Sequence, residues 1–501
     1  MIDVSDTVST NPVSGVSYAV PTDTNDRERI DRFLGANAGR PVVVVQGLGF
    51  VGAVMSLVCA NALGAEYAVI GVDLPTPQSY WRIASINEGV FPLSAEDPKI
   101  PDFYAAARKK GNFIATHDPY AYSVADVIIV DVNLDVEKHS GLDGCLENFG
   151  VDMSGFRRAI EVIGQNCRED ALVLIETTVP PGTTQKVAAP IIREELQKRG
   201  LRTDHIRVGH SYERVMPGPE YVDSIRTFPR VYSAIDEASA QATEQFLRTI
   251  IDTDRCPLTR LGTTNATEMA KVLENSYRAM NISFVVEWSR FAEEAGVDLY
   301  AVVNAIRQRP THANLMYPGI GVGGYCLTKD PLLASWSRQY LFGREQGLES
   351  SEHAVALNDR MPVFAADFLR KHYGSLLGKK VILLGVSYRG EVGDTRFSPV
   401  DRFYDCLESQ GAELILHDPY VGFWPEKGRE VSCDLMDALN HEAHIVVIST
   451  GHSLYASDAL IEALLSKEPM FVFDTVGLLS AEQLAALIQK HTVKVLGRGD
   501  L

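Results

Sequence analysis

The sequence has no cysteine pair in the C-x-x-C spacing that zinc sites and redox motifs use. Its seven cysteines are odd in number and scattered along 501 residues. This usage fits free thiols in a reducing cytoplasm, and it predicts no metal site. The first residues, MIDVSDTVSTNPVSGVSY, lack both the basic start and the apolar stretch of a secretory signal. We therefore expect a cytoplasmic protein.

Positive charge is also scarce. Against 65 Asp and Glu residues there are 47 Lys and Arg residues, which leaves a formal charge of −18. Nucleic-acid binding needs a basic face, so we expect no nucleic acid as partner. The uncharged stretch 41–65 is long enough for a membrane span, but its glycine pattern favours a buried strand and helix, so we expect no membrane partner either. An anionic small ligand is not excluded, because backbone N–H groups at helix N-termini can hold phosphate. The composition is globular, with 46% hydrophobic and 22% charged residues, and the length suggests about three domains.

A glycine-rich turn carries the first functional signal. Val42–Val45 predicts a buried strand, GLGFVG follows it, and a helix of small apolar residues comes next. A second apolar strand ends at Asp73, 21 residues after Gly52. This order is typical of a dinucleotide site, although a glycine turn without nucleotide is the alternative. Asp73 would bind a ribose 2′-hydroxyl and repel a 2′-phosphate, which favours NAD over NADP. The candidate contacts at the turn are Gly47, Gly49, Phe50, Val51 and Gly52.

The remaining apolar runs predict the fold class. Short strands alternate with helical spacers in two series, one before and one after a stretch of long helices over residues 264–306. We expect an α/β protein with two Rossmann-like doubly wound domains joined by a long-helix connector. The predicted parts are an N-terminal extension (1–36), an NAD-binding domain (37–235), a central helical region (236–350) and a C-terminal Rossmann-like domain (351–501).

A second glycine-rich segment, GIGVGGYCLTKD over residues 319–330, places Cys326 on backbone that can approach a ligand closely. A lysine and an aspartate nearby offer charge to tune a thiol and to position water. A structural glycine loop with a bystander cysteine is the alternative on this segment alone.

This loop resembles the catalytic-cysteine loop of the nucleotide-sugar 6-dehydrogenases, the UDP-glucose/GDP-mannose dehydrogenase family. Further segments match family motifs in the same order along the chain, from about Val42 to the C-terminus. They are IETTVPPGTT (175–184), YERVMPG (212–218), EMAKVLENSYR (268–278) and GDTRFSP (393–399).

The resemblance implies an NAD-dependent, four-electron oxidation of a C6 alcohol to a carboxylate. Cys326 matches the nucleophile that holds the aldehyde as a thiohemiacetal and then as a thioester. Asp330 would orient or deprotonate water, and Glu213 matches the general base. Lys271 and Asn275, four residues apart on one helix face, suit stabilisation of an oxyanion.

The resemblance also implies binding contacts. Glu176, Thr178, Lys329 and Arg396 match cofactor positions. A UDP-sugar would bind in the cleft between domains, and a homodimer would form through the helical connector. The candidate substrate contacts are Glu213, Arg214, Lys271, Asn275, Arg278, Gly319 and Gly323.

Some positions depart from the family pattern. Leu134 stands where a threonine usually holds the catalytic water, and Thr177 is a possible substitute. Tyr212 replaces a proline and Tyr325 a histidine. The ERVMPG form favours the branch that acts on UDP-N-acetylhexosamines over UDP-glucose. The extension 1–36 has no explanation at this level.

Two other functions stay open. A simple two-electron dehydrogenase of the hydroxyacid type would need no cysteine nucleophile. A non-catalytic NAD-binding scaffold would need neither the thiol nor its polar neighbours.

Overall fold

The computed structural model describes residues 7–12, 14–23, 25–93, 97–141, 146–212, 214–215 and 218–501. The chain forms two compact units. Unit 1 comprises Met1–Asp135, Val151–Val272 and Trp336–Glu345. Unit 2 comprises Val136–Gly150, Leu273–Ser335 and Gln346–Leu501.

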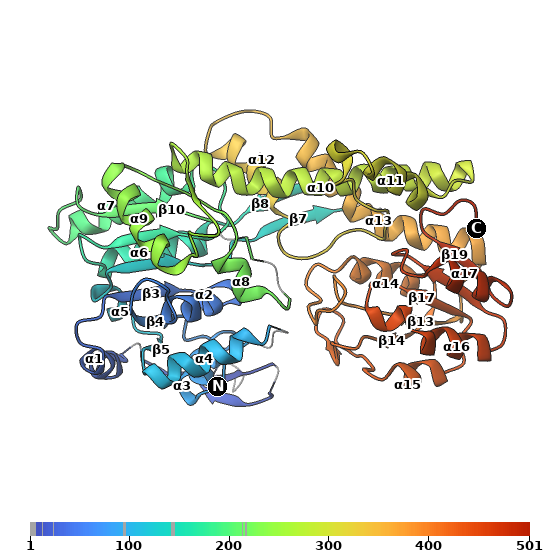
Figure 1. Cartoon of the computed structure of the whole chain (residues 1–501), viewed down its shortest axis with the longest axis horizontal. Helices are drawn as coiled ribbons and strands as arrows, with labels where there is room; N and C mark the ends of the chain where they lie inside the picture. Colours follow the sequence, from blue (N-terminus) through green and yellow to red (C-terminus); the bar gives the residue numbers. More distant parts are fainter. Residues whose placement is uncertain are drawn as a thin grey trace. The chain divides into compact units, whose positions relative to one another are not determined.

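Unit 1 is built on an eight-stranded sheet with the order β12-β11-β10-β9-β6-β3-β4-β5 (Figure 1). Its strands are β3 (Val42–Gln46), β4 (Ala68–Val72), β5 (Phe113–Thr116), β6 (Val127–Val130), β9 (Leu172–Ile175), β10 (Arg207–His210), β11 (Arg230–Ala234) and β12 (Leu258–Arg260). The described pairings are parallel apart from β10 with β11. Since β4 and β6 flank β3, the order of the strands reverses there, which is where doubly wound sheets bind ligands.

The helices of unit 1 explain why its strands are apolar on both faces. They are α1 (Arg27–Ala36), α2 (Phe50–Ala60), α3 (Tyr80–Glu88), α4 (Lys99–Lys110), α5 (Tyr120–Ser123), α6 (Ser154–Asn166), η2 (Thr184–Ala188), α7 (Ala189–Lys198), α8 (Tyr221–Arg226) and α9 (Glu237–Ile250). One face of the sheet, including Val43 and Val45, packs with α2, α4 and α9 in a single core. Residues Gly52 to Ala60 of α2 are all buried, so this helix is apolar all round.

The N-terminal segment, which the sequence left unexplained, folds onto unit 1. Val8–Thr10 (β1) and Ser17–Ala19 (β2) pair as an antiparallel hairpin. Ser9 and Asn11 of this hairpin are buried, and α1 follows it.

Unit 2 contains a five-stranded parallel sheet with the order β14-β13-β17-β18-β19. Its strands are β13 (Lys380–Leu384), β14 (Glu413–His417), β17 (Ile445–Ile448), β18 (Phe471–Asp474) and β19 (Thr492–Val495), and the two small sheets are β7 (Val136–Ser140) with β8 (Leu146–Val151) and β15 (Phe423–Trp424) with β16 (Arg429–Glu430). Alternate residues of β13 enter two cores, Val381 with α10, α13 and α14, and Ile382 with α15 and α16. Helices therefore cover both faces of this sheet.

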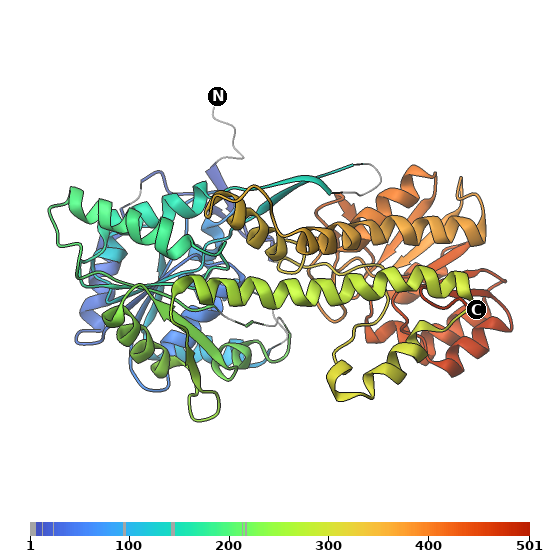
Figure 2. The same cartoon turned by 90° about the horizontal axis from the view of Figure 1, so that it is seen from above.

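The predicted long helices are present. Helix α10 runs uninterrupted over Thr264–Ala295, as Figure 2 shows, and ends where Gly296 has φ +69°. The other helices of this half are α11 (Leu299–Arg307), η3 (Pro310–His312), α12 (Asp330–Tyr340), α13 (Glu349–Tyr373), α14 (Pro399–Ser409), α15 (Leu435–Asn440), η4 (Ser453–Ala456), α16 (Asp458–Ser466) and α17 (Ala481–Ile488). Two Rossmann-like sheets and a long-helix segment confirm the predicted fold class.

Candidate active site

The glycine turn of unit 1 lies between β3 and α2, at the carboxyl end of β3. Gly47 has φ +96°, and a Cβ there would lie 2.3 Å from the carbonyl oxygen of Asp131. A Cβ on Gly52 would lie 1.9 Å from the Gly47 oxygen, so this turn admits only glycine at both positions. A Cβ on Gly49 would meet no atom within 4 Å, and no side chain caps the start of α2 there. Open space before a helix N-terminus fits the pyrophosphate of a dinucleotide.

Asp73 follows β4 at the same edge of the sheet. Its carboxylate accepts hydrogen bonds from the N–H groups of Leu48 (3.2 Å) and Leu74 (2.8 Å) and from the Arg82 guanidinium (3.3 Å). Burial raises the pKa of Asp73, and Arg82 lowers it in part. An oriented carboxylate at this edge fits the adenosine ribose, so the residues here suit NAD.

The loop after β9 contains three further candidates. Glu176 is fully buried and accepts a hydrogen bond from Arg230 at 2.8 Å, so part of this carboxylate belongs to a buried ion pair. Thr178 is half-buried. The Thr177 hydroxyl donates to the Val130 oxygen and accepts from the Val132 N–H, so its proton is used inside the fold. Leu134 is buried.

Sequence reasoning missed one residue at this loop. Glu268, in the first turns of α10, accepts hydrogen bonds from the N–H groups of Gly182 (2.6 Å) and Thr184 (2.7 Å). It connects α10 to the end of the loop that follows β9. Its place in the EMAK motif was the available signal, but the contact spans more than eighty residues.

Burial raises the pKa of Glu268 to about 7, although its N–H donors favour the carboxylate. The folded protein therefore binds this proton more tightly than the unfolded chain does. The free energy of unfolding should fall by about 3 kcal/mol as pH rises from about 4.5 to about 7, and Glu268→Gln should remove that part of the slope. Urea unfolding at a series of pH values measures it. Glu274→Gln, an exposed site on the same helix, is the matched control.

Lys271 and Asn275 both extend from α10, one turn apart. Lys271 is buried, and its ammonium lies 5.6 Å from the centre of the Tyr212 ring. Arg214 bonds the Tyr212 hydroxyl and the Pro229 oxygen, both at 3.3 Å. Arg278 is exposed, and Glu213 lies outside the described residues.

Cys326 occupies the turn before α12 in unit 2, and its side chain is exposed. Its carbonyl oxygen accepts the Asp330 N–H at 2.9 Å, which ties the turn to the start of the helix. The pKa of Tyr388 is raised mainly by burial, next by the charge of Asp394 and more weakly by Cys326. The Cys326 thiol therefore lies close enough to interact electrostatically with the Tyr388 hydroxyl.

The two candidate glycines before Cys326, Gly319 and Gly323, lie in different surroundings. A Cβ on Gly323 would lie 2.4 Å from the Phe397 oxygen and 2.8 Å from the Tyr388 Cβ, so this glycine lets two loops of unit 2 pack closely. At Gly319 the nearest atom to such a Cβ is the Thr475 oxygen at 3.8 Å, which is ordinary contact. Close packing of protein against protein therefore explains Gly323 without a ligand.

Asp330 is the centre of a buried polar cluster in unit 2. One carboxylate oxygen accepts the Asn275 side-chain amide at 2.6 Å, and the other lies 3.2 Å from the Lys329 ammonium. Lys329 is also buried, 4.3 Å from the centre of the Tyr325 ring. Three of the predicted side chains are thus brought together directly.

Arg396 lies in the loop before α14 and pairs with Asp394 through Nε (2.9 Å) and Nη2 (2.7 Å). The next residue, Phe397, has φ +54°, a left-handed conformation that is costly for a bulky side chain. Backbone strain of this kind is found most often at functional loops.

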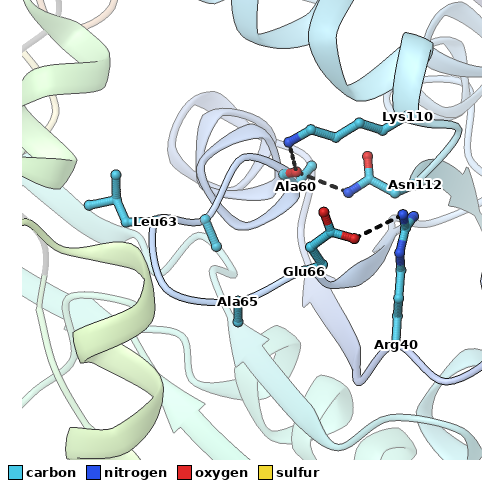
Figure 3. Close-up of a pocket in the computed structure, with 8 residues that line it drawn as sticks. Arg40, Ala60, Leu63, Ala65, Glu66, Lys110 and Asn112 are labelled. Atoms are coloured by element: carbon cyan, nitrogen blue, oxygen red, sulfur yellow. Dashed lines mark hydrogen bonds and ion pairs between the residues drawn. The ribbon is translucent and has the colours of Figure 1, made fainter.

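A cavity of about 300 Å³ lies at the other end of the unit 1 sheet (Figure 3). Lys110 and Asn112 bond the Ala60 oxygen at the end of α2, and Arg40 pairs with Glu66. Since Gly47 and Asp73 follow the carboxyl ends of β3 and β4, this cavity is separate from the dinucleotide site.

Three family models match the chain in order. They are described as the NAD binding domain (residues 42–251), the central domain (265–358) and the UDP binding domain (382–481) of the UDP-glucose/GDP-mannose dehydrogenase family. The chain belongs to this family. The predicted resemblance, the NAD cofactor and the assignment as an NAD-dependent nucleotide-sugar dehydrogenase are confirmed.

Similar members of the family carry related names. A UDP-N-acetyl-D-mannosamine dehydrogenase of Methanocaldococcus jannaschii is 29% identical over 92% of this chain and 97% of its own length. One of Pyrococcus horikoshii is 30% identical over 83% of this chain and 90% of its own. The solved P. horikoshii UDP-D-ManNAc dehydrogenase covers 92% of this chain and 100% of its own, with 27% identity and a TM-score of 0.76.

The described residues contain neither a candidate membrane span nor a candidate metal cluster. No described helix is both long enough and apolar enough to cross a bilayer. No group of three or more His, Cys, Asp or Glu side chains within the described ranges could hold a metal ion.

Proposed function

We propose that this dehydrogenase oxidises the C6 alcohol of a UDP-N-acetylhexosamine, UDP-N-acetylmannosamine first among them, to the uronate through a covalent Cys326 intermediate. The observation that carries the mechanism is an exposed thiol in the turn that begins α12, four residues before the buried Asp330 cluster. The sugar class rests on relatives named UDP-N-acetyl-D-mannosamine dehydrogenase.

The overall reaction consumes one sugar nucleotide, two NAD and one water. NAD, when bound, accepts a hydride in each of two oxidations, of the alcohol to the aldehyde and of the thiohemiacetal to the thioester. Between them the Cys326 sulfur adds to the aldehyde carbon, and the carbonyl oxygen takes a proton. Water then attacks the thioester carbon, the C–S bond breaks, and the thiol and a carboxylate are released. A sulfur–carbon bond keeps the aldehyde in place for the second oxidation.

The other candidate catalytic residues have parts in this chemistry. Tetrahedral adducts carry charge on oxygen, and the Lys271 ammonium and Asn275 amide are suitable donors to it. Asp330 is held in one orientation by Asn275 and Lys329, so it suits a role in aligning the hydrolytic water. A reactive thiol of this kind must stay reduced, which is why we place the enzyme in the cytoplasm.

A panel of nucleotide sugars tests the substrate class. Purified protein with NAD is offered UDP-N-acetylmannosamine, UDP-N-acetylglucosamine, UDP-glucose and GDP-mannose, and NADH formation is followed. We expect the highest kcat/KM with UDP-N-acetylmannosamine. A preference for UDP-glucose would contradict the substrate class, and NADH from none of them would favour the non-catalytic alternative.

We further propose a homodimer through α10. Its exposed side carries a stripe of large apolar side chains at helical spacing, between 41% and 63% exposed. The stripe consists of Leu273, Tyr277, Met280, Phe284, Trp288 and Phe291. Met280 and Phe284 also line a groove of about 440 Å³ with residues of α13, including Leu357. An apolar face of this length needs a covering surface, and a second copy presents the same face in return.

Trp288→Glu is expected to break this dimer, because it places a carboxylate in the middle of the apolar stripe. Light scattering should give twice the chain mass of 55.0 kDa for the wild type and a single chain mass for the variant. Leu377→Glu, at an exposed leucine between α13 and β13, is the control and should leave the mass unchanged. A wild-type protein of one chain mass would overturn the proposal.

A further inference from the structure

The NAD site of unit 1 has a support that precedes the family's NAD-binding model, which begins at residue 42. Helix α3 starts at Tyr80, just after the loop that follows Asp73. Its N-cap residue, Ser79, makes no side-chain bond to a helix N–H, and its hydroxyl donates to the Leu74 oxygen at 2.7 Å. The first turn of α3 therefore lacks the usual local cap.

Ser9 of the N-terminal hairpin supplies that cap. Its hydroxyl accepts the Trp81 N–H at 2.9 Å and donates to the Pro77 oxygen at 2.7 Å. Ser9 is completely buried, so water does not substitute for either contact. A residue seventy positions away thus fixes both the loop after Asp73 and the first turn of α3.

That first turn carries Arg82, whose guanidinium lies 3.3 Å from the Asp73 carboxylate. Both side chains are mostly buried, at 27% and 12% exposure. A shift of the α3 N-terminus would move Arg82 and change how Asp73 is oriented toward a ribose.

The N-terminal segment also connects to Asp73 through β5. Asp26, which precedes α1, accepts the Thr116 hydroxyl at 2.9 Å, and its N–H donates to Asp118 at 2.8 Å. Thr116 ends β5, and its carbonyl oxygen accepts the Asp73 N–H at 3.2 Å. The segment therefore braces the Asp73 backbone through β5 and its carboxylate through α3.

We infer that the hairpin of residues 8–19 is a working part of the NAD site, in which Ser9 is a positioning residue that sets affinity for the adenosine half of the cofactor. Residues that only cover a surface would stabilise the fold without changing how tightly the ribose is bound. The hairpin differs because its one buried hydroxyl caps the turn that orients the ribose-binding carboxylate.

Ser9→Ala tests this inference by binding, without turnover. Calorimetry should show that Kd for NAD and Kd for ADP-ribose both rise, roughly three- to tenfold. The reason is that loss of the cap on α3 changes how Asp73 is oriented toward the ribose. Nicotinamide mononucleotide, which lacks the adenosine half, should bind with the same Kd as it does to the wild type. In the cofactor-free protein, the Trp81 amide should exchange hydrogen faster.

Thr10→Ala is the matched control, because Thr10 is exposed on the same strand and its hydroxyl contacts Ser17. It should leave Kd for NAD and ADP-ribose unchanged. Unchanged Kd values in Ser9→Ala, with or without a lower Tm, would overturn the inference and leave the hairpin a purely structural cover. Since these are binding measurements, they are independent of which sugar the enzyme oxidises.

Discussion

Cys326→Ser should lower the rate of uronate formation by roughly 10³- to 10⁴-fold, because a serine hydroxyl is a far weaker nucleophile toward the aldehyde. Binding of NAD should be unchanged, since Cys326 is not among the residues predicted to contact the cofactor. Product analysis by mass spectrometry with UDP-N-acetylmannosamine measures the effect. Wild-type turnover to the uronate in this variant would rule out a covalent sulfur intermediate.

Cys433→Ser is the control for this experiment. Cys433 is also an exposed thiol, and it lies just before α15 in unit 2. Its replacement tests whether loss of any accessible thiol is harmful, and we expect full activity. Alkylation of the wild type followed by peptide mapping should, in parallel, link loss of activity to Cys326.

Asp330→Asn should have the second largest effect. Asp330 is completely buried, between the Asn275 amide and the Lys329 ammonium. The substitution removes the charge that compensates Lys329 and sets one amide against another. We expect a loss of stability of about 3–5 kcal/mol, as when one partner of a buried ion pair is removed. We also expect kcat to fall roughly 10²- to 10³-fold, because the water is no longer aligned.

A double variant separates these two effects. Lys329→Met together with Asp330→Asn removes both charges, so most of the lost stability should return. Activity should not return, because the carboxylate is still absent. Urea unfolding and steady-state kinetics measure the two quantities separately. If the double variant recovers kcat along with stability, Asp330 serves the fold and not the reaction.

The sequence predicted those parts of the site that depend on local order. Strand, glycine turn, helix and Asp73 follow one another within about 30 residues, and such a unit is stabilised by its own contacts. The structure leaves open space at Gly49 and no room for a Cβ at Gly52. The long helices over residues 264–306 were predictable from their apolar spacing, but the end of α10 before Gly296 was not predicted.

Contacts between distant segments were beyond reach of the sequence. Glu268 bonds N–H groups far earlier in the chain, and Ser9 caps a helix seventy residues later. In the sequence, these two residues look the same as any exposed glutamate or serine. Only their positions in the folded protein reveal which backbone groups they bond. Gly323 shows the converse, because its glycine identity was visible while the loop that requires it, at Tyr388 and Phe397, was not.

The ratio of NADH formed to sugar consumed tests the central claim most directly. With limiting UDP-N-acetylmannosamine and excess NAD, oxidation through a Cys326 thioester should yield two NADH per sugar and the uronate as the product. One NADH per sugar, with an aldehyde as the product, would contradict the four-electron mechanism.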